Sequence, residues 1–213
     1  MTDKAKASRE KILLNEESFS YLFFEGSSSQ NPIIFFHATG LNAATYLNLL
    51  TKIFEDFDGE RSIYAFDQRG HGLSLAEADH TKLKSWKQFS KEAISFLNSL
   101  DHESVDLMGH SMGGIVASEV ASQLKLKVQN LIMLEPVLYY APKDVIKLKL
   151  KNFLKFDDLS ASNKSSSAKQ RRNNFASFEE AIEHFTGRAM FASWPEESIM
   201  NYLEGGLVKK EGS

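Results

Sequence analysis

A five-residue segment, GHSMG at positions 109–113, constrains the fold of this chain more than any other feature. It follows the apolar run VDLM and precedes IVASEVASQL, so a serine stands in a turn between a predicted strand and a predicted helix. In such a turn the serine hydroxyl is exposed above the sheet, and Gly109 and Gly113 let the strand and the helix approach closely. The pattern predicts that Ser111 is a nucleophile. The alternative is a glycine-rich turn with an incidental serine.

Short apolar runs alternate with helical periodicity over the first two thirds of the chain. Apolar residues between Trp86 and Leu100 recur at spacings of three and four, as on one face of a helix. Apolar runs without such spacing are typical of strands buried on both faces of a parallel sheet. We therefore predict an α/β core over residues 1–140, with a mostly parallel sheet flanked by helices. The predicted strands are Phe19–Phe24, Ile33–His37, Ile63–Phe66, Val105–Met108 and Leu131–Leu134.

The pattern changes after Pro136, and we predict a helical cap over residues 141–213. An apolar stripe over residues 146–154 and the segments Phe178–Arg188 and Glu196–Leu203 have helical spacing, and Ser160–Ser167 is a polar loop. The first of these helices is basic, which suits either an anionic surface or lysine stems lying over an apolar stripe. Aromatic residues of the cap are candidates for an acyl pocket or for the core of the cap itself: Phe153, Phe156, Phe185, Phe191 and Trp194.

Composition excludes several classes of protein. The chain of 213 residues contains no cysteine, which rules out disulfides, thiolate metal sites and a cysteine nucleophile. Its 25 basic and 28 acidic side chains give a net charge of −3, which argues against nucleic-acid binding. The charged first residues do not resemble a secretion signal, and no apolar run is long enough for stable membrane insertion. We expect a cytoplasmic protein without a metal or an organic cofactor.

A second motif, HATG at positions 37–40, ends the apolar run PIIFF. Acyl transfer needs two N–H donors directed at the developing oxyanion, and one commonly comes from the loop after this strand. We predict that the backbone N–H groups of Thr39 and Met112 are these donors, with His37 in the loop and His110 in the turn beside them. The alternative is an ordinary turn whose small residues let the chain reverse.

A third motif, DQRGHG at positions 67–72, ends the run SIYAF. Aspartate and glycine are typical of a tight loop, and Arg69 can pair with a carboxylate that holds the loop in place. We interpret His71 as a histidine that packs within this loop rather than as a catalytic base.

In this order and spacing the three motifs resemble the α/β-hydrolase fold family. HATG resembles its oxyanion loop, DQRGHGLS the loop after the next strand, and GHSMGG the nucleophile turn. The resemblance extends from about Phe19 to the end, and within the family the chain is similar to esterase-like or lipase-like members with a helical cap. A serine at position 111 argues against epoxide hydrolases and dehalogenases, whose nucleophile is an aspartate.

The catalytic base that the resemblance implies is not found at its expected place. The family order is nucleophile, acid, histidine, and only His184 follows Ser111, on a segment that we interpret as a helix surface. Glu135, after the next predicted strand, is a candidate for the acid, or else it caps the strand or pairs with a lysine of the cap. We expect the chain to be the amino-terminal part of a longer hydrolase or a natural truncation. Missing carboxy-terminal strands would leave an exposed sheet edge through which the protein can associate.

The resemblance implies that Ser111 attacks the carbonyl carbon of a small or medium carboxylic ester with an apolar acyl part. Water would then hydrolyse the acyl-enzyme, provided that a histidine is supplied. Two alternatives stay open. One is a carbon–carbon bond hydrolase acting on a dienoic keto acid, which uses the same serine and lid. The other is a non-catalytic ligand-binding protein that keeps the pocket but lacks the base.

Overall fold

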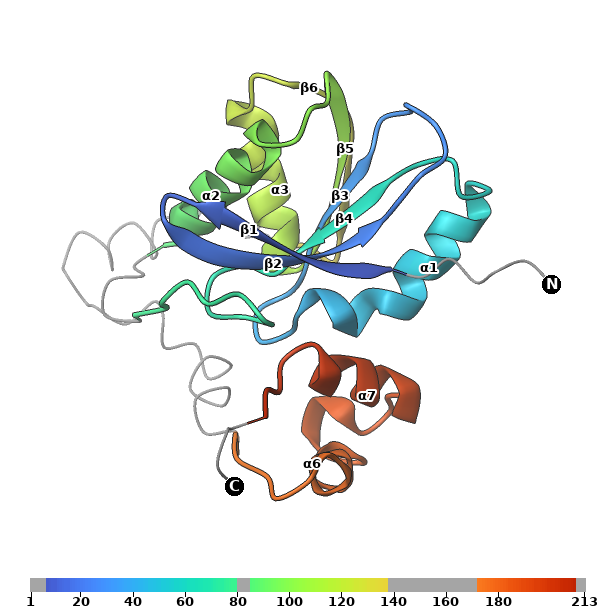
Figure 1. Cartoon of the computed structure of the whole chain (residues 1–213), viewed down its shortest axis with the longest axis vertical. Helices are drawn as coiled ribbons and strands as arrows, with labels where there is room; N and C mark the ends of the chain where they lie inside the picture. The colour runs from blue at the N-terminus through green and yellow to red at the C-terminus, as the bar shows by residue number, and fades with distance from the viewer. Residues whose placement is uncertain (1–6, 80–84, 138–171, 210–213) are drawn as a thin grey trace, which may run out of the picture.

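The computed structural model describes residues 7–79, 85–137 and 172–209, and its centre is one six-stranded sheet (Figure 1). The strand order is β1-β2-β4-β3-β5-β6. Parallel pairing joins β4 to β3, β3 to β5 and β5 to β6, whereas β1–β2 and β2–β4 are antiparallel. The mostly parallel sheet is therefore confirmed. The strands are β1 (Ser8–Leu14), β2 (Glu17–Phe24), β3 (Ile33–Phe36), β4 (Ile63–Phe66), β5 (Ser104–His110) and β6 (Lys127–Leu134).

The strand β1 is absent from the expectations drawn from the sequence. It forms a hairpin with β2 through Asn15 and Glu16, whose φ angles of 49° and 69° fit a two-residue turn that follows the twist of the strands. Three of the seven residues in its sequence, SREKILL, are charged, which suits the edge of the sheet, where side chains remain in contact with water; Leu14 at its end is buried. The five predicted strands all exist, with ends that differ by up to four residues.

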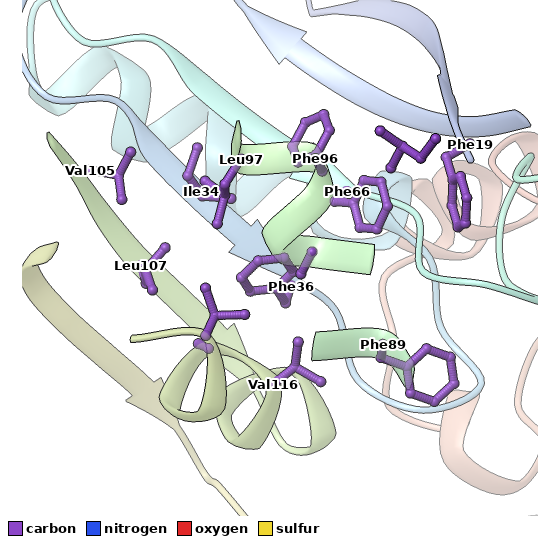
Figure 2. Close-up of a cluster of buried hydrophobic side chains, with 14 of the residues drawn as sticks. Phe19, Ile34, Phe36, Phe66, Phe89, Phe96, Leu97, Val105, Leu107 and Val116 are labelled. Carbon is purple, nitrogen blue, oxygen red and sulfur yellow. The ribbon is translucent and has the colours of Figure 1, made fainter. Parts of the chain in front are cut away.

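Helices cover both faces of the sheet, and each face has its own apolar core. Alternate residues of β3 point to opposite sides: Ile34 and Phe36 face α2 (Lys87–Asn98) and α3 (Met112–Gln123). Figure 2 shows these two side chains among the buried residues of that layer, with Phe66, Phe96 and Val116. On the other face, Ile33 and Phe35 pack in the layer that includes α1 (Leu47–Asp56). Burial on both faces is what the continuous apolar runs predict.

The last described segment is helical, as expected. It comprises α6 (Phe178–Phe185), the 3-10 turn η2 (Ala189–Phe191) and α7 (Glu196–Glu204), which share a small apolar core. This segment lies against η1 (Ala43–Tyr46) and α1 (Figure 1). The side-chain amide of Asn42 donates to the carbonyl of Tyr202 at 2.8 Å, and that of Asn201 donates to Asn48 at 3.2 Å.

Some expectations concerning the cap lie outside the described residues. They include the stripe over residues 146–154, the loop Ser160–Ser167, and the side chains of Phe153 and Phe156. Of the other aromatic candidates, Phe191 and Trp194 pack in the core of the helical segment, and Phe185 belongs to that core and also lines a cavity. Among the residues that the structure describes, no helix is long and apolar enough to cross a membrane.

The strand β6 lies at one edge of the sheet and is largely exposed. Leu131, Ile132 and Met133 keep 39%, 40% and 38% of their surface accessible, although successive residues point to opposite faces. In the described part of the chain, only β5 pairs with β6. These apolar residues are typical of a strand in the interior of a sheet, although β6 lies at its edge.

Candidate active site

Ser111 lies in the turn between β5 and α3, with φ 53° and ψ −113°. A positive φ is unfavourable for a residue with a side chain, so the surrounding contacts must hold this conformation. The two glycines of the motif make the turn possible. A Cβ on Gly113 would overlap the carbonyl oxygen of Phe36, and one on Gly109 would overlap the carbonyl of Gly113. The close contact of β3, β5 and α3 therefore depends on the absence of these side chains.

The Ser111 side chain is half-buried, and no hydrogen bond to its hydroxyl is present among the described residues. Its backbone is fixed on both sides, because its N–H donates to the carbonyl of Leu134 at 2.9 Å and its own carbonyl accepts from Gly114 at 3.1 Å. The first bond ties the turn to the end of β6. The serine is thus held by its main chain, while its hydroxyl has no hydrogen-bond partner among the described residues.

The loop that carries HATG meets the start of α3. The hydroxyl of Thr39 lies 3.1 Å from the sulfur of Met112, which is itself buried, while Thr39 is exposed. Met112 is the first residue of α3, where backbone N–H groups have no acceptor within the helix and carry a partial positive charge. The structure thus brings together the loop and the turn that hold the two residues predicted as oxyanion donors.

His37 is fully buried and links two loops through hydrogen bonds. Its Nε2 accepts a hydrogen bond from the backbone N–H of Gln68 at 3.0 Å, and its Nδ1 donates to the carbonyl of Ala38 at 2.9 Å. Desolvation, together with the neighbouring His71, lowers the pKa of His37 well below its ordinary value. The ring is therefore neutral, and its two nitrogens are both used in structural contacts.

The loop with DQRGHG is held by charged groups. Arg69 pairs with Glu17 and with Glu92, which confirms the expectation that it binds a carboxylate. The buried Asp67 accepts from the backbone N–H of Ala43 at 2.7 Å and pairs with Arg9 at 2.6 Å. These bonds fix the loop next to the HATG segment.

His71 packs within its loop, as interpreted from the sequence. Its Nδ1 donates to the carbonyl of Arg69 at 2.9 Å, and its Nε2 accepts from the N–H of Gly40 at 3.0 Å. Desolvation lowers its pKa, so the ring remains a neutral acceptor for Gly40.

His110 and Glu135 lie beside the nucleophile turn. The Nδ1 of His110 is 2.7 Å from the hydroxyl of Tyr46, which sequence reasoning missed because Tyr46 belongs to none of the three motifs. Desolvation lowers the pKa of His110, and the negative charge of Glu135 opposes that shift. Glu135 follows β6 directly, is exposed and has a φ of 42°. Its charge is thus close to the turn.

His184 lies on α6, away from the elements that hold the turn. Its ring contacts Phe175 and Phe185, with centroid distances of 5.4 and 5.1 Å, and its Nδ1 is 3.4 Å from the guanidinium of Arg188. These contacts within the helical segment agree with its interpretation as a helix-surface residue. His80 lies outside the described residues.

A cavity of about 490 Å³ separates the HATG loop from the helical segment. Thr39 lines it, so the cavity begins at the loop that holds one of the predicted oxyanion donors. At its far side, Arg172 lies 4.8 Å above the ring of Phe175 and pairs with Glu180 at 2.7 Å. The remaining lining residues come from the two loops and from the helical segment: Gly40, Leu41, Asn42, Gly70, His71, Gly72, Asn173, Phe185, Tyr202, Leu203, Gly206 and Leu207.

Comparisons with known proteins identify the family and the fold of the chain. A family model described as "Serine aminopeptidase, S33" matches residues 27–195. The chain belongs to this family. Structural similarity shows that this member of the S33 family has the α/β-hydrolase fold. Its structure matches that of the thioesterase domain from the curacin biosynthetic pathway with a TM-score of 0.69. That match covers 97% of this chain and 70% of the other at 19% identity, and it shows the fold alone.

Two curated relatives of this S33 family chain are similar in sequence. It is 28% identical over 121 residues to 1-acylglycerol-3-phosphate O-acyltransferase ABHD5 of Rattus norvegicus, covering 55% of this chain and 33% of the relative. It is 29% identical over 119 residues to protein phosphatase methylesterase 1 of Saccharomyces cerevisiae, covering 49% and 30%. The chain thus spans about a third of the length of these two relatives.

Proposed function

We propose that Ser111 is the nucleophile of a serine esterase that works through an acyl-enzyme. The serine Oγ would bond to the carbonyl carbon of the ester, and the alcohol would leave with a proton. Water would then release the acid and restore the serine. The observation that carries the proposal is the strained φ of 53° at Ser111 in a strand–turn–helix, with its hydroxyl unpaired among the described residues.

The N–H groups of Thr39 and Met112 are the proposed oxyanion donors. The contact between these two residues at 3.1 Å and the position of Met112 at the N-terminus of α3 support this assignment. A preorganised donor pair stabilises the charge that develops on the carbonyl oxygen, and removing one donor typically costs about a hundredfold to a thousandfold in rate.

Glu135 is the proposed acid, because its charge lies close to the nucleophile turn. The mechanism also requires a histidine base. The described histidines do not supply one, since no ring nitrogen among them contacts the Ser111 hydroxyl. We therefore propose the reaction on condition that a histidine from outside the described residues completes the site.

The substrate we propose is a carboxylic ester whose apolar acyl part occupies the cavity of about 490 Å³. Four rings border that cavity, those of His71, Phe175, Phe185 and Tyr202. We further propose a division at about residue 140 between the core that carries Ser111 and a cap that covers the cavity. Association through the exposed edge of β6 is part of the same proposal.

The test is labelling of Ser111. The native protein is isolated from its own cells and exposed to a fluorophosphonate, after which the intact mass and the modified residue are determined. We expect a phosphonate on Ser111, turnover of an activated ester, and loss of both in Ser111→Ala. A protein that binds an apolar ester, yet shows neither label nor turnover, would be a ligand-binding protein and would contradict the proposal.

A matched pair of variants tests the donor at position 39. Thr39→Ala keeps the backbone N–H, whereas Thr39→Pro removes it. We expect ester turnover to persist in the alanine variant and to fall about a hundredfold in the proline variant. Equal turnover in the two variants would remove Thr39 as a donor.

A further inference from the structure

The backbone N–H groups of the HATG loop differ in whether they have a hydrogen-bond acceptor. The N–H of Ala38 donates to the Tyr46 hydroxyl at 3.2 Å, and that of Gly40 donates to His71 Nε2 at 3.0 Å. The N–H of Leu41 donates to the carbonyl of Ala38 at 3.2 Å. Within the described part of the chain, the N–H of Thr39 has no such acceptor. The one amide left for a ligand oxygen is therefore flanked by two amides whose acceptors are side chains.

The hydroxyl of Tyr46 connects the loop to the nucleophile turn. It accepts from the N–H of Ala38, so its own proton is directed to Nδ1 of His110, 2.7 Å away. Burial raises the pKa of Tyr46 to about 12, so the hydroxyl keeps this proton at neutral pH. The ring itself is held by Phe35, with 4.6 Å between centroids. One side chain thus ties the residue before Thr39 to the residue before Ser111.

His71 holds the other side of Thr39. Because its Nδ1 donates to the carbonyl of Arg69, its Nε2 carries the lone pair that accepts from Gly40. The ring contacts those of His37 and Phe89, at centroid distances of 4.9 and 6.3 Å. Its position and its tautomer are therefore both fixed by contacts within the fold.

We propose that Tyr46 and His71 are positioning residues that set the direction of the Thr39 N–H. Peptide planes are rigid, so a loop whose amide planes are anchored before and after one residue leaves that residue's N–H little freedom. Rigid placement of a donor is what stabilises an oxyanion, because no reorganisation is then needed during the reaction. This inference rests on the proposed function, in which Thr39 contributes such a donor.

The experiment uses Tyr46→Phe, which keeps the ring and removes the hydroxyl. The matched control is Tyr64→Phe, which removes another tyrosine–histidine contact, the one of 3.2 Å to His102, at a distance from the loop. Two quantities are measured: the exchange rates of the Ala38, Thr39 and Gly40 amides by NMR, and the kinetics of ester hydrolysis by the native protein. His71→Gln, which retains an acceptor, is compared with His71→Leu, which does not.

We expect Tyr46→Phe to accelerate exchange at Ala38 and to lower kcat about tenfold, a fraction of the loss from deleting a donor, with KM within twofold of wild type. Tyr64→Phe should change neither quantity by more than twofold. His71→Leu should accelerate exchange at Gly40 and lower kcat, and His71→Gln should restore part of both. A kcat that is unchanged in Tyr46→Phe and in His71→Leu would overturn the inference.

The exchange measurement separates this inference from the proposed function. A wild-type protein that shows neither turnover nor label would contradict the proposed serine hydrolase function. Slow exchange at Ala38 and Gly40 beside faster exchange at Thr39 would still support the proposed anchoring. Equal exchange at the three amides in the wild type would overturn the anchoring, whatever the activity.

Discussion

His37 and His71 lie ring against ring, with 4.9 Å between their centroids, and each accepts a hydrogen bond from the other's loop. His37 accepts from the backbone N–H of Gln68, while His71 accepts from that of Gly40. Two neutral imidazoles therefore join the HATG loop to the DQRGHG loop. Protonation of either ring would remove the acceptor and place a charge at a desolvated position.

From the hydrogen bonds of His37 and His71 we predict that the folded protein loses stability in acid. Both pKa values are lowered from 6.5 in the folded protein, so the unfolded chain binds more protons below that pH. Stability is then complete above pH 6.5 and declines as the pH falls. Each ring that stays neutral in the folded protein while the unfolded chain takes up the proton adds to this loss, by about 1.36 kcal/mol for each unit by which its two pKa values differ.

The measurement is urea unfolding at pH 7.5 and pH 5 for the wild type, His71→Gln and His184→Gln. His71→Gln should show a smaller difference between the two pH values, because one titrating ring has been removed. His184 lies outside both loops, so removing its ring leaves the hydrogen bonds of His37 and His71 in place. An equal pH dependence in all three proteins would contradict this account.

The sequence was informative where residue type dictates the backbone. The turn at Gly109–Gly113 and the parallel strands follow from glycine spacing and continuous apolar runs, so they could be predicted. The strand β1 could not, because three of its seven residues are charged and only Leu14 is buried, so it lacks the continuous apolar run by which buried strands are found. Local turn geometry at Asn15, rather than hydrophobicity, specifies it.

Around the candidate site, too, some residues could be predicted from the sequence and others could not. Motifs pointed to Ser111 and Thr39, but Tyr46 lies outside every motif and reaches His110 only through the tertiary fold. Likewise, the acceptor of the Gly40 amide comes from a residue 31 positions later. Hydrogen bonds between side chains and distant amides carry no periodic signal, so a structure is needed to find them.

Gly113→Ala should disrupt the nucleophile turn. A Cβ at this position overlaps the carbonyl oxygen of Phe36, which belongs to a central strand and cannot move freely. We expect a loss of about 3 kcal/mol or more in the free energy of unfolding, the upper range for overpacking. Gly114→Ala is the matched control, since its Cβ meets its nearest atoms at 3.2 and 3.3 Å. Thermal unfolding of both variants checks the prediction, and similar midpoints would refute it.

Asp67→Asn should destabilise the loop that carries Arg69. The fully buried carboxylate pairs with Arg9 at 2.6 Å and accepts from the N–H of Ala43, so an amide loses the charge and one acceptor. We expect a loss of about 1 to 3 kcal/mol, as for a lost hydrogen bond to a charged group, because the Arg9 side chain is partly exposed and water can solvate it. Asp56→Asn removes an exposed pair with Lys52 and should leave stability unchanged. Urea unfolding decides, and equal effects of the two variants would show that burial at Asp67 is unimportant.

We predict that the protein associates with another chain through the edge strand β6, and that a single charge on this strand weakens the association. Leu131, Ile132 and Met133 are each about two-fifths exposed, and an accessible apolar edge favours strand pairing with another chain. A lysine at position 132 would place a charge on this edge, so Ile132→Lys should raise the dissociation constant at least about tenfold, or 1.4 kcal/mol. The control is Leu13→Lys on β1, the opposite edge, where the leucine is 72% exposed among charged residues. Sedimentation velocity over a hundredfold range of concentration measures the effect. A wild type that stays monomeric and unfolds cooperatively throughout that range would rule out association through β6.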